Sequence, residues 1–325
     1  MAVLFAVLTL AAPAGASSCT AQAELSPQDR EALAAVSGQL AVAVQQQNLA
    51  ELKGALLPGV EQDWQAIRDA IEASAPLMKN GKMELRNAYL LNASDLEKPA
   101  DTQFFCTNAG GSMTVTLTMK ALPPGRYALV LADAAGAPLR GQLAFILAWD
   151  TAANGWKLGG LAVRPGRLDG HDGLWWWRRA RELAAADQVK PDPWSAWYAY
   201  EMARALLVPV DFLSSPNLDR LNAEQAEIPH SPANSFPLAI PDGDRTWTID
   251  AVRPDLTMLH ADLAVIYPST GITDPGAQRT EAIAVLSAFL KAQPGLRQNF
   301  HGLWAFAVTG GKQTPVLELP MAQIP

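Results

Sequence analysis

One segment decides how this chain folds: it runs from Trp156 to Pro209 and reads WKLGGLAVRPGRLDGHDGLWWWRRARELAAADQVKPDPWSAWYAYEMARALLVP. Six of the ten tryptophans in the 325-residue chain lie in it: Trp156, Trp175, Trp176, Trp177, Trp194 and Trp197. So much aromatic surface in one place is either buried in a core or used to bind a partner. The segment starts in a strand-like stretch and continues into two helices, so it predicts a sheet that leads directly into a helical hairpin.

The predicted hairpin covers 174–208, and its second helix begins at Asp192 and Pro193, a capping residue followed by a proline. Small and large residues then alternate at helical spacing: Ala196, Tyr200, Ala203 and Leu207. This stripe resembles the second helix of a tetratricopeptide repeat, although only one hairpin is present. Two interpretations stay open. The hairpin packs on the neighbouring sheet, or Trp175 and Trp176 bind a ligand or partner.

Upstream of this segment, apolar residues first recur at the spacing of a helix and then alternate with polar residues, as in a strand. A helix begins at Ser26-Pro27, a short one follows Asn48, and a third surrounds Trp64. From Lys82 onward the apolar period is two, which is typical of strands. The predicted strands cover 83–90, 103–107, 112–119, 126–131, 141–149 and 155–163. Helices followed by an antiparallel meander predict the α+β class.

Two stretches of this region carry a family resemblance: the step Gln47–Leu52 between the first helices, and the closing hairpin 145–158. On these stretches, residues 26–165 resemble the nuclear transport factor 2-like superfamily. The resemblance implies a helix-backed, curved antiparallel sheet around a conical cavity. The candidates for its ligand-binding wall are Trp64, Tyr89, Tyr127 and Trp149. The superfamily holds isomerases, dehydratases and non-enzymatic accessory domains, so the resemblance implies no particular activity.

The C-terminal third predicts a smaller α+β domain. Four prolines between Pro229 and Asp244 indicate a linker or an extended segment that wraps over the surface. Strand-like runs and one helix beginning at Asp274 follow, which predict a helix laid on a small antiparallel sheet. The predicted divisions are 1–16 (signal peptide), 17–166 (conical domain), 167–228 (Trp-rich hairpin and short helix), 229–244 (linker) and 245–325 (C-terminal domain).

The N-terminus resembles an export signal. An apolar run from Val3 to Leu10 precedes Pro13 and the small residues Ala14-Gly15-Ala16, although no basic residue comes first. The alternative is a buried N-terminal helix. An exported, periplasmic or extracellular chain with two cysteines predicts a disulfide between Cys19 and Cys106, with lipidation of Cys19 as the alternative.

Charge and motifs exclude several functions. The net charge is −7, from 25 basic and 32 acidic residues, which argues against a nucleic-acid partner. The chain has no Gly-x-Ser-x-Gly elbow, no His-Glu-x-x-His, no phosphate-binding glycine loop, and no sequence sign of a cofactor.

The best local constellation is Asp169-Gly170-His171-Asp172, in which two carboxylates flank an imidazole. Such a group can ligate a metal ion or transfer protons. The alternative is that Asp172 caps the following helix and His171 makes a structural hydrogen bond. His260 and Asp262 share one face of a predicted strand, but nothing in the sequence brings them to His171 or His301.

These patterns favour an exported, non-catalytic binding or scaffold protein whose partner is a protein, a peptide or an envelope component. The first domain contains no histidine, and its acids lie mostly near the ends of predicted elements. The alternative is a small-molecule isomerase, dehydratase or hydrolase that uses the conical cavity or the Asp169/His171/Asp172 cluster.

Overall fold

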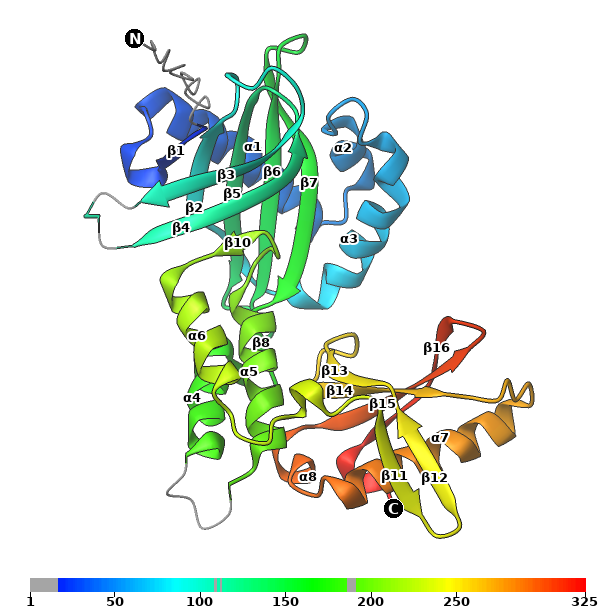
Figure 1. Cartoon of the computed structure of the whole chain (residues 1–325). Helices are drawn as coiled ribbons and strands as arrows, with labels where there is room; N and C mark the ends of the chain where they lie inside the picture. The colour runs from blue at the N-terminus through cyan, green and yellow to red at the C-terminus, as the bar shows by residue number, and fades with distance from the viewer. Residues whose placement is uncertain (1–16, 108–109, 112, 186–190) are drawn as a thin grey trace, which may run out of the picture.

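The computed structural model describes residues 17–107, 110–111, 113–185 and 191–325 (Figure 1). It confirms the α+β class. An N-terminal unit of helices and strands stands above a column of helices, and a second sheet with its own helix lies beside the foot of that column. The predicted signal segment, 1–16, lies outside the described residues.

Three helices cover one face of the N-terminal sheet: α1 (Pro27–Gln45), α2 (Leu49–Gly54) and α3 (Trp64–Met78). The start of α1 is fixed by Ser26, whose hydroxyl accepts the N–H of Asp29 at 3.0 Å. Asn48 caps α2 in the same way through the N–H of Glu51, at 3.3 Å. These caps satisfy N–H groups that have no partner inside a helix.

The main sheet is antiparallel and has the order β1-β2-β5-β6-β7. Its strands are β1 (Ser18–Ala21), β2 (Lys82–Asn92), β5 (Arg126–Ala135), β6 (Gly141–Asp150) and β7 (Gly155–Pro165). On the helix side of the sheet, Phe145 and Leu158 are fully buried against Leu33 and Ile71. On this side of the sheet, where the resemblance implies a conical cavity, side chains of the sheet and the helices pack in one core.

A second, smaller sheet crosses the opposite face, with the order β10-β4-β3. Its strands are β3 (Ala100–Thr107), β4 (Thr114–Leu122) and β10 (Leu213–Ser214). Phe104 and Leu117 are buried between the two sheets. β10 connects two helices of the helical column in sequence, so its pairing with β4 ties that column to the N-terminal unit.

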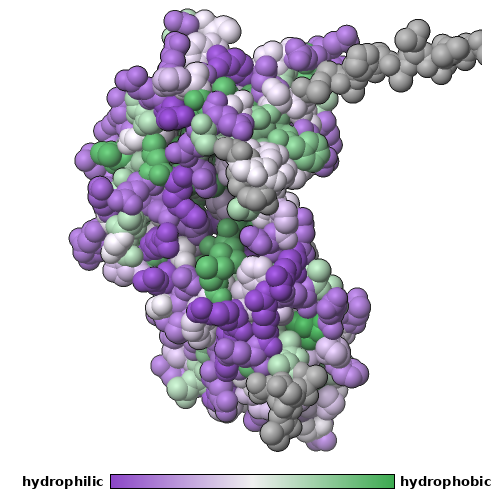
Figure 2. Space-filling model, turned by 90° about the vertical axis from the view of Figure 1, so that its left-hand side faces the viewer, coloured by the Kyte–Doolittle hydropathy of each residue, from purple (hydrophilic) through white to green (hydrophobic). Residues whose placement is uncertain are grey.

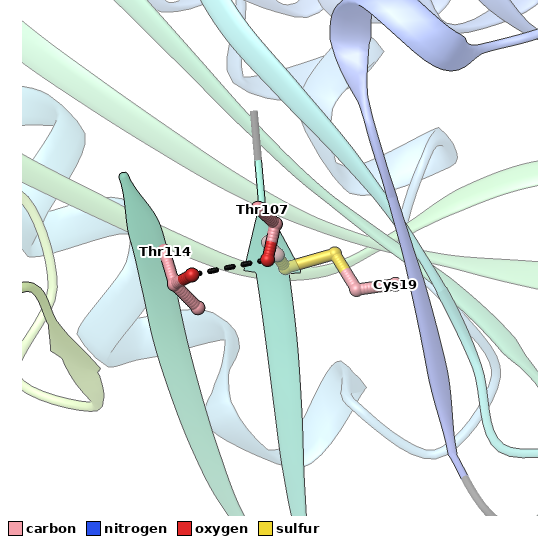
Figure 3. Close-up of a disulfide and its surroundings, with 4 residues drawn as sticks. Cys19, Thr107 and Thr114 are labelled. Atoms are coloured by element: carbon pink, nitrogen blue, oxygen red, sulfur yellow. Dashed lines mark hydrogen bonds between the residues drawn. A yellow bond between two sulfur atoms is a disulfide. The ribbon is translucent and has the colours of Figure 1, made fainter. Parts of the chain in front are cut away.

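The predicted disulfide is confirmed: Cys19 on β1 is bonded to Cys106 on β3, with 5.1 Å between their Cα atoms. Figure 3 shows it beside a hydrogen bond between the hydroxyls of Thr107 and Thr114, 3.0 Å long. The bond joins positions 87 residues apart. It therefore clamps the small sheet to the first strand of the large one.

The helical column consists of α4 (Gly173–Ala184), α5 (Pro193–Leu207) and α6 (Pro216–Ala226), preceded by the short strands β8 (Arg167–Leu168) and β9 (His171–Asp172). Glu224 on α6 holds the three helices together. It accepts hydrogen bonds from Trp177 and Arg181 on α4, and from Tyr200 on α5. Arg220 on α6 is a fourth donor residue.

The C-terminal unit contains a hairpin, a four-stranded sheet and two helices. Its strands are β11 (Leu238–Asp242), β12 (Arg245–Ile249), β13 (Ala251–Asp255), β14 (Asp262–Pro268), β15 (Gly302–Thr309) and β16 (Lys312–Pro320), and its helices are α7 (Pro275–Ala292) and α8 (Leu296–Asn299). The expectation of a wholly antiparallel sheet is wrong, because β14 and β15 run parallel. α7 carries the chain from the end of one to the start of the other, as parallel pairing requires.

The column and the C-terminal unit share one core. Trp176 stacks on Phe300 with 5.6 Å between ring centroids, and Trp194 meets Phe289 at 5.9 Å. The proline-rich stretch 229–244 belongs to the same body, because β11 within it pairs with β12. None of the helices in the described part of the chain is both long and apolar enough to cross a membrane.

Candidate functional site

The tryptophans of the central segment are packed side chains. Trp176 and Trp194 are 2% and 9% exposed, and the indoles of Trp175, Trp177 and Trp197 lie half-buried against the same core. Aromatic area that is buried in this way stabilises a core. The packing favours the first of the two interpretations, in which the hairpin is core.

The four predicted wall residues of the cone do not converge. Trp64 and Trp149 pack against the helix-side core, where Trp149 meets the edge of Trp156 at 5.4 Å. Tyr89 and Tyr127 lie on the opposite face of the sheet, against the core between the two sheets. Alternation in a strand predicts which residues share a face, but not which layer covers that face.

A groove of about 750 Å³ opens where the two sheets of the N-terminal unit meet α4 and α6. Figure 2 shows a hollow on this side of the molecule with a hydrophobic patch at its lower edge. The groove's apolar lining comes from the N-terminal unit and from the helical column. Its members are Val115, Leu131, Leu174, Leu207, Leu213 and Leu218. Tyr89 also lines it, as does Trp177. A mostly apolar hollow of this size is typical of small-molecule sites, which span about 300–1,000 Å³.

Two arginines lie in this groove, and none of its described lining residues is acidic. Arg30 donates to the carbonyl oxygens of Ala23 and Leu25, at 3.4 and 3.2 Å. Arg86 donates to Asp133 at 3.3 Å, but the same carboxylate also binds Arg140 at 3.0 Å. One acid therefore serves two arginines, and the groove is positively charged in a chain whose net charge is −7.

Leu174, at the start of α4, is 56% exposed and forms part of the groove's wall. Its position follows from the close packing of Gly173 against α5, where an added Cβ atom would lie 2.5 Å from Leu207 and 3.1 Å from the carbonyl oxygen of Ala203. The helix is capped by Asp172, which accepts the N–H of Trp175 at 2.9 Å. An exposed leucine is thereby held beside the arginines by a well-defined helix start.

The predicted metal cluster Asp169, His171 and Asp172 is divided among three roles. Asp172 is the helix cap, and His171 stacks on Trp175 with 3.6 Å between ring centroids. Asp169 accepts from the backbone N–H of Ala261 at 2.7 Å and bonds to the ring of His260 at 2.6 Å. These three side chains do not form a common ligand set among the described residues.

A different cluster forms at one end of the C-terminal sheet. The rings of His260 and His301 stack with 4.0 Å between their centroids and 14° between their planes. Each ring bonds to a carboxylate: His260 to Asp169 at 2.6 Å and His301 to Asp262 at 2.8 Å. Glu318 completes the group, because Asp262, His301 and Glu318 each offer a ligand atom within 4.8 Å of the other two.

The carboxyl groups of this cluster are poorly solvated. Burial raises the pKa of Asp262, while the hydrogen bond from His301 opposes that rise. Burial also raises the pKa of Glu318, and the nearby Asp262 adds to it by repulsion between like charges. Both effects favour the neutral form or a bound cation.

Part of this cluster can be predicted from the sequence. The spacing of His260 and Asp262 places both on one strand face, but Glu318 and Asp169 arrive from distant segments. Arg30 and Arg86 likewise carry no local signal, because isolated arginines in a helix and a strand are ordinary surface residues. Comparisons of the chain with protein-family models, with curated proteins and with solved structures find no match.

Proposed function

We propose that this chain is an exported, non-catalytic binding protein whose groove holds an acidic amphiphile, a small molecule with an elongated apolar body and one anionic group. The observation that supports this most is the composition of the groove. Its lining is largely apolar, includes Arg30 and Arg86, and contains no acid among its described residues.

The apolar wall would supply most of the affinity. Burying a methylene group contributes about 0.8 kcal/mol, which corresponds to roughly a fourfold change in affinity per methylene. Leu174 and Leu213 lie on opposite units at the groove, so a chain between them would contact both. Affinity should therefore rise with the length of the apolar tail.

The arginines would select the head group. Because Asp133 is shared between Arg86 and Arg140, a second carboxylate at Arg86 would be attracted by uncompensated positive charge. A hydrogen bond to a charged group contributes about 1.5–3 kcal/mol. An amphiphile with a tail of the same length and a cationic head group would be repelled by the arginines.

Export is supported by two features. The segment 1–16 has the apolar and small-residue pattern of a signal peptide. The bond between Cys19 and Cys106 is of a kind that persists in oxidising compartments. The helix-backed curved sheet of residues 26–165 is also in keeping with a nuclear transport factor 2-like domain, a superfamily in which non-enzymatic domains are common.

The alternative function, a small-molecule isomerase, dehydratase or hydrolase, requires an acid or base beside the bound molecule. No described residue in the lining of the groove is a carboxylic acid or a histidine. Tyr89 is its titratable phenol, and burial raises the pKa of that hydroxyl. The groove therefore favours binding over catalysis.

Calorimetric titration with decanoate, decanol and decyltrimethylammonium tests this proposal on the purified chain with its disulfide intact. We expect one decanoate per chain, weaker binding of decanol and the weakest binding of the cation. Arg86→Gln should lower the affinity for decanoate about tenfold. Arg68→Gln, on the exposed surface of α3, is the matched control and should change nothing.

Equal binding of the three head groups would contradict the proposed selection by charge. Absence of decanoate binding would contradict the amphiphile as occupant, and so would tighter binding of an acidic hydrophobic peptide than of any of the three amphiphiles.

A further inference from the structure

We propose that Asp262, His301 and Glu318 form a binding site for one divalent transition-metal ion, of which zinc is the best match. The three residues come from neighbouring strands of the C-terminal sheet, and their ligand atoms lie within 4.8 Å of one another. They are not the residues that the sequence pattern around His171 indicates.

The register of the sheet explains why these three residues meet. Asp262 is the first residue of β14, His301 directly precedes β15, and Glu318 lies on β16. β15 lies between the other two strands, with Leu303 paired to Leu263 on one side and to Leu319 on the other. The starts of β14 and β15 therefore meet the end of β16 at one corner.

Gly302 makes room for the carboxylates at this corner. A Cβ atom at that position would lie 2.7 Å from Oε1 of Glu318 and 3.0 Å from Oδ1 of Asp262. Distances this short between non-bonded atoms would force at least one carboxylate to move. The missing side chain thus creates a recess into which two oxygen ligands project.

Two carboxylate oxygens of this cluster lack a hydrogen-bond partner among the described residues. Oδ2 of Asp262 and Oε1 of Glu318 are both fully buried and unpaired. Asp262 as a whole is 0% exposed. An unpaired buried acceptor costs about 1–3 kcal/mol, and more when it is charged. A cation between the two oxygens would satisfy both and remove their mutual repulsion.

The imidazole of His301 is held in place beside these oxygens. One face of its ring stacks on His260, which is itself anchored by Asp169. Its Nδ1 atom lies 2.8 Å from Asp262. The side chain of His301 keeps 34% of its surface exposed, so an ion has a route from solvent. Asp169 and His260 are positioning residues, because they set the orientation of the ring.

The donor set points to zinc. Imidazole nitrogen and carboxylate oxygen are both donors that zinc accepts, and three protein ligands leave its fourth position open for water or a ligand. Magnesium prefers oxygen ligands alone in octahedral geometry. The absence of a thiolate or thioether from the group argues against copper(I).

A proton shared between Asp262 and Glu318 is the competing explanation for the two unpaired oxygens. It would satisfy one oxygen as donor and the other as acceptor without any ion. The two explanations differ in a direct way, because the shared proton gives no metal stoichiometry and leaves His301 open to modification.

Zinc titration of the full chain, purified without a polyhistidine tag and freed of metal by a chelator, decides between them. We expect one zinc ion per chain by calorimetry, and at least a tenfold loss of affinity in each of Glu318→Gln and His301→Gln. His230→Asn is the matched control. His230 is an exposed histidine in a left-handed turn, a conformation that asparagine accepts, and its loss should leave zinc affinity unchanged.

A second measurement needs no variant. Diethyl pyrocarbonate modifies exposed histidines, and mass spectrometry of the unaltered chain should show that zinc protects His301 but not His230. Absence of stoichiometric zinc binding would overturn the proposal. So would full zinc affinity in both ligand variants, or equal protection of His230. The groove shares no residue with this site, so decanoate binding is an independent result.

Discussion

The groove and the metal-ligand cluster at Asp262, His301 and Glu318 are built in opposite ways. The groove is a wide, largely apolar hollow assembled where two units meet, and its charge comes from arginines. The cluster is a narrow corner of one sheet, and its charge comes from the buried carboxylate of Asp262 and the half-buried carboxylate of Glu318. Interfaces between units create space, whereas strand register brings together specific atoms. Changes that affect one site should therefore leave the other intact.

Loss of the disulfide should give the largest effect and should be confined to the groove's unit. The double variant Cys19→Ser and Cys106→Ser opens a loop that spans 87 residues, so the N-terminal unit should lose about 4.6 kcal/mol of unfolding free energy. Denaturant unfolding measures this loss. Decanoate affinity should fall, because Cys106 lines the groove, while zinc affinity should stay unchanged. A simultaneous loss of zinc binding would contradict the independence of the two sites.

Gly302→Ala should give the next largest effect. Unlike loss of the disulfide, it should weaken the zinc site and leave the groove unchanged. The added methyl group meets the carboxylates of Glu318 and Asp262 and the carbonyl oxygen of Leu319, the last at 2.8 Å. Zinc affinity should fall at least tenfold, and overpacking should reduce the stability of the C-terminal unit by about 1–3 kcal/mol. Decanoate binding should not change. Gly243→Ala, at a hairpin turn whose added Cβ meets nothing, is the control for zinc affinity.

Leu174→Glu should weaken decanoate binding in the groove and leave zinc binding unchanged. It places a carboxylate in the wall that contains Arg86, so decanoate should bind about tenfold more weakly while decyltrimethylammonium gains affinity. Because Leu174 is 56% exposed, the unfolding free energy should change by less than about 0.5 kcal/mol. Zinc affinity provides the control. Unchanged selectivity among head groups would contradict the electrostatic role of the groove.

The smallest expected effect concerns Glu224. Its carboxylate accepts hydrogen bonds from the helices of the column, which lies between the two sites. Its hydrogen bonds from Arg181, Trp177 and Arg220 lower the pKa of its carboxyl from 4.5 to about 2. A lowered pKa stabilises the fold above pH 4.5, and this contribution is lost as pH falls toward 2. After allowance for solvent screening it amounts to about 1 kcal/mol.

Thermal unfolding of Glu224→Gln measures this contribution. The variant should be less stable than the unaltered chain at pH 7 and equally stable near pH 2. Glu72→Gln, in an exposed ion pair on α3, is the control. An equal difference in stability at both pH values would show that packing rather than charge holds the column together.

The elements that local chemistry defines could be predicted from the sequence. Ser26, Asp192 and Asp274 begin helices as expected, because a cap and the proline after it act on adjacent backbone. The disulfide followed from two cysteines in a chain with an export pattern. Asp172 proved to be a cap, the alternative to its role as a metal ligand.

Long-range geometry could not be predicted. Trp64 and Trp149 lie on the helix side of the main sheet, and Tyr89 and Tyr127 lie on the side that β3 and β4 cross. No spacing encodes that crossing. The parallel pairing of β14 with β15 depends on the path of α7. Glu318 reaches Asp262 only through that pairing and the small size of Gly302.

The most direct test of the proposed function is a crystal structure of the chain with 10-bromodecanoate, read by the anomalous signal of bromine. We expect one bromine site against the apolar wall that includes Leu174 and Leu213, with the carboxylate hydrogen-bonded to Arg86 or Arg30. A bromine site among α1, α2 and α3, or a ligand whose carboxylate lies away from both arginines, would contradict the proposed function.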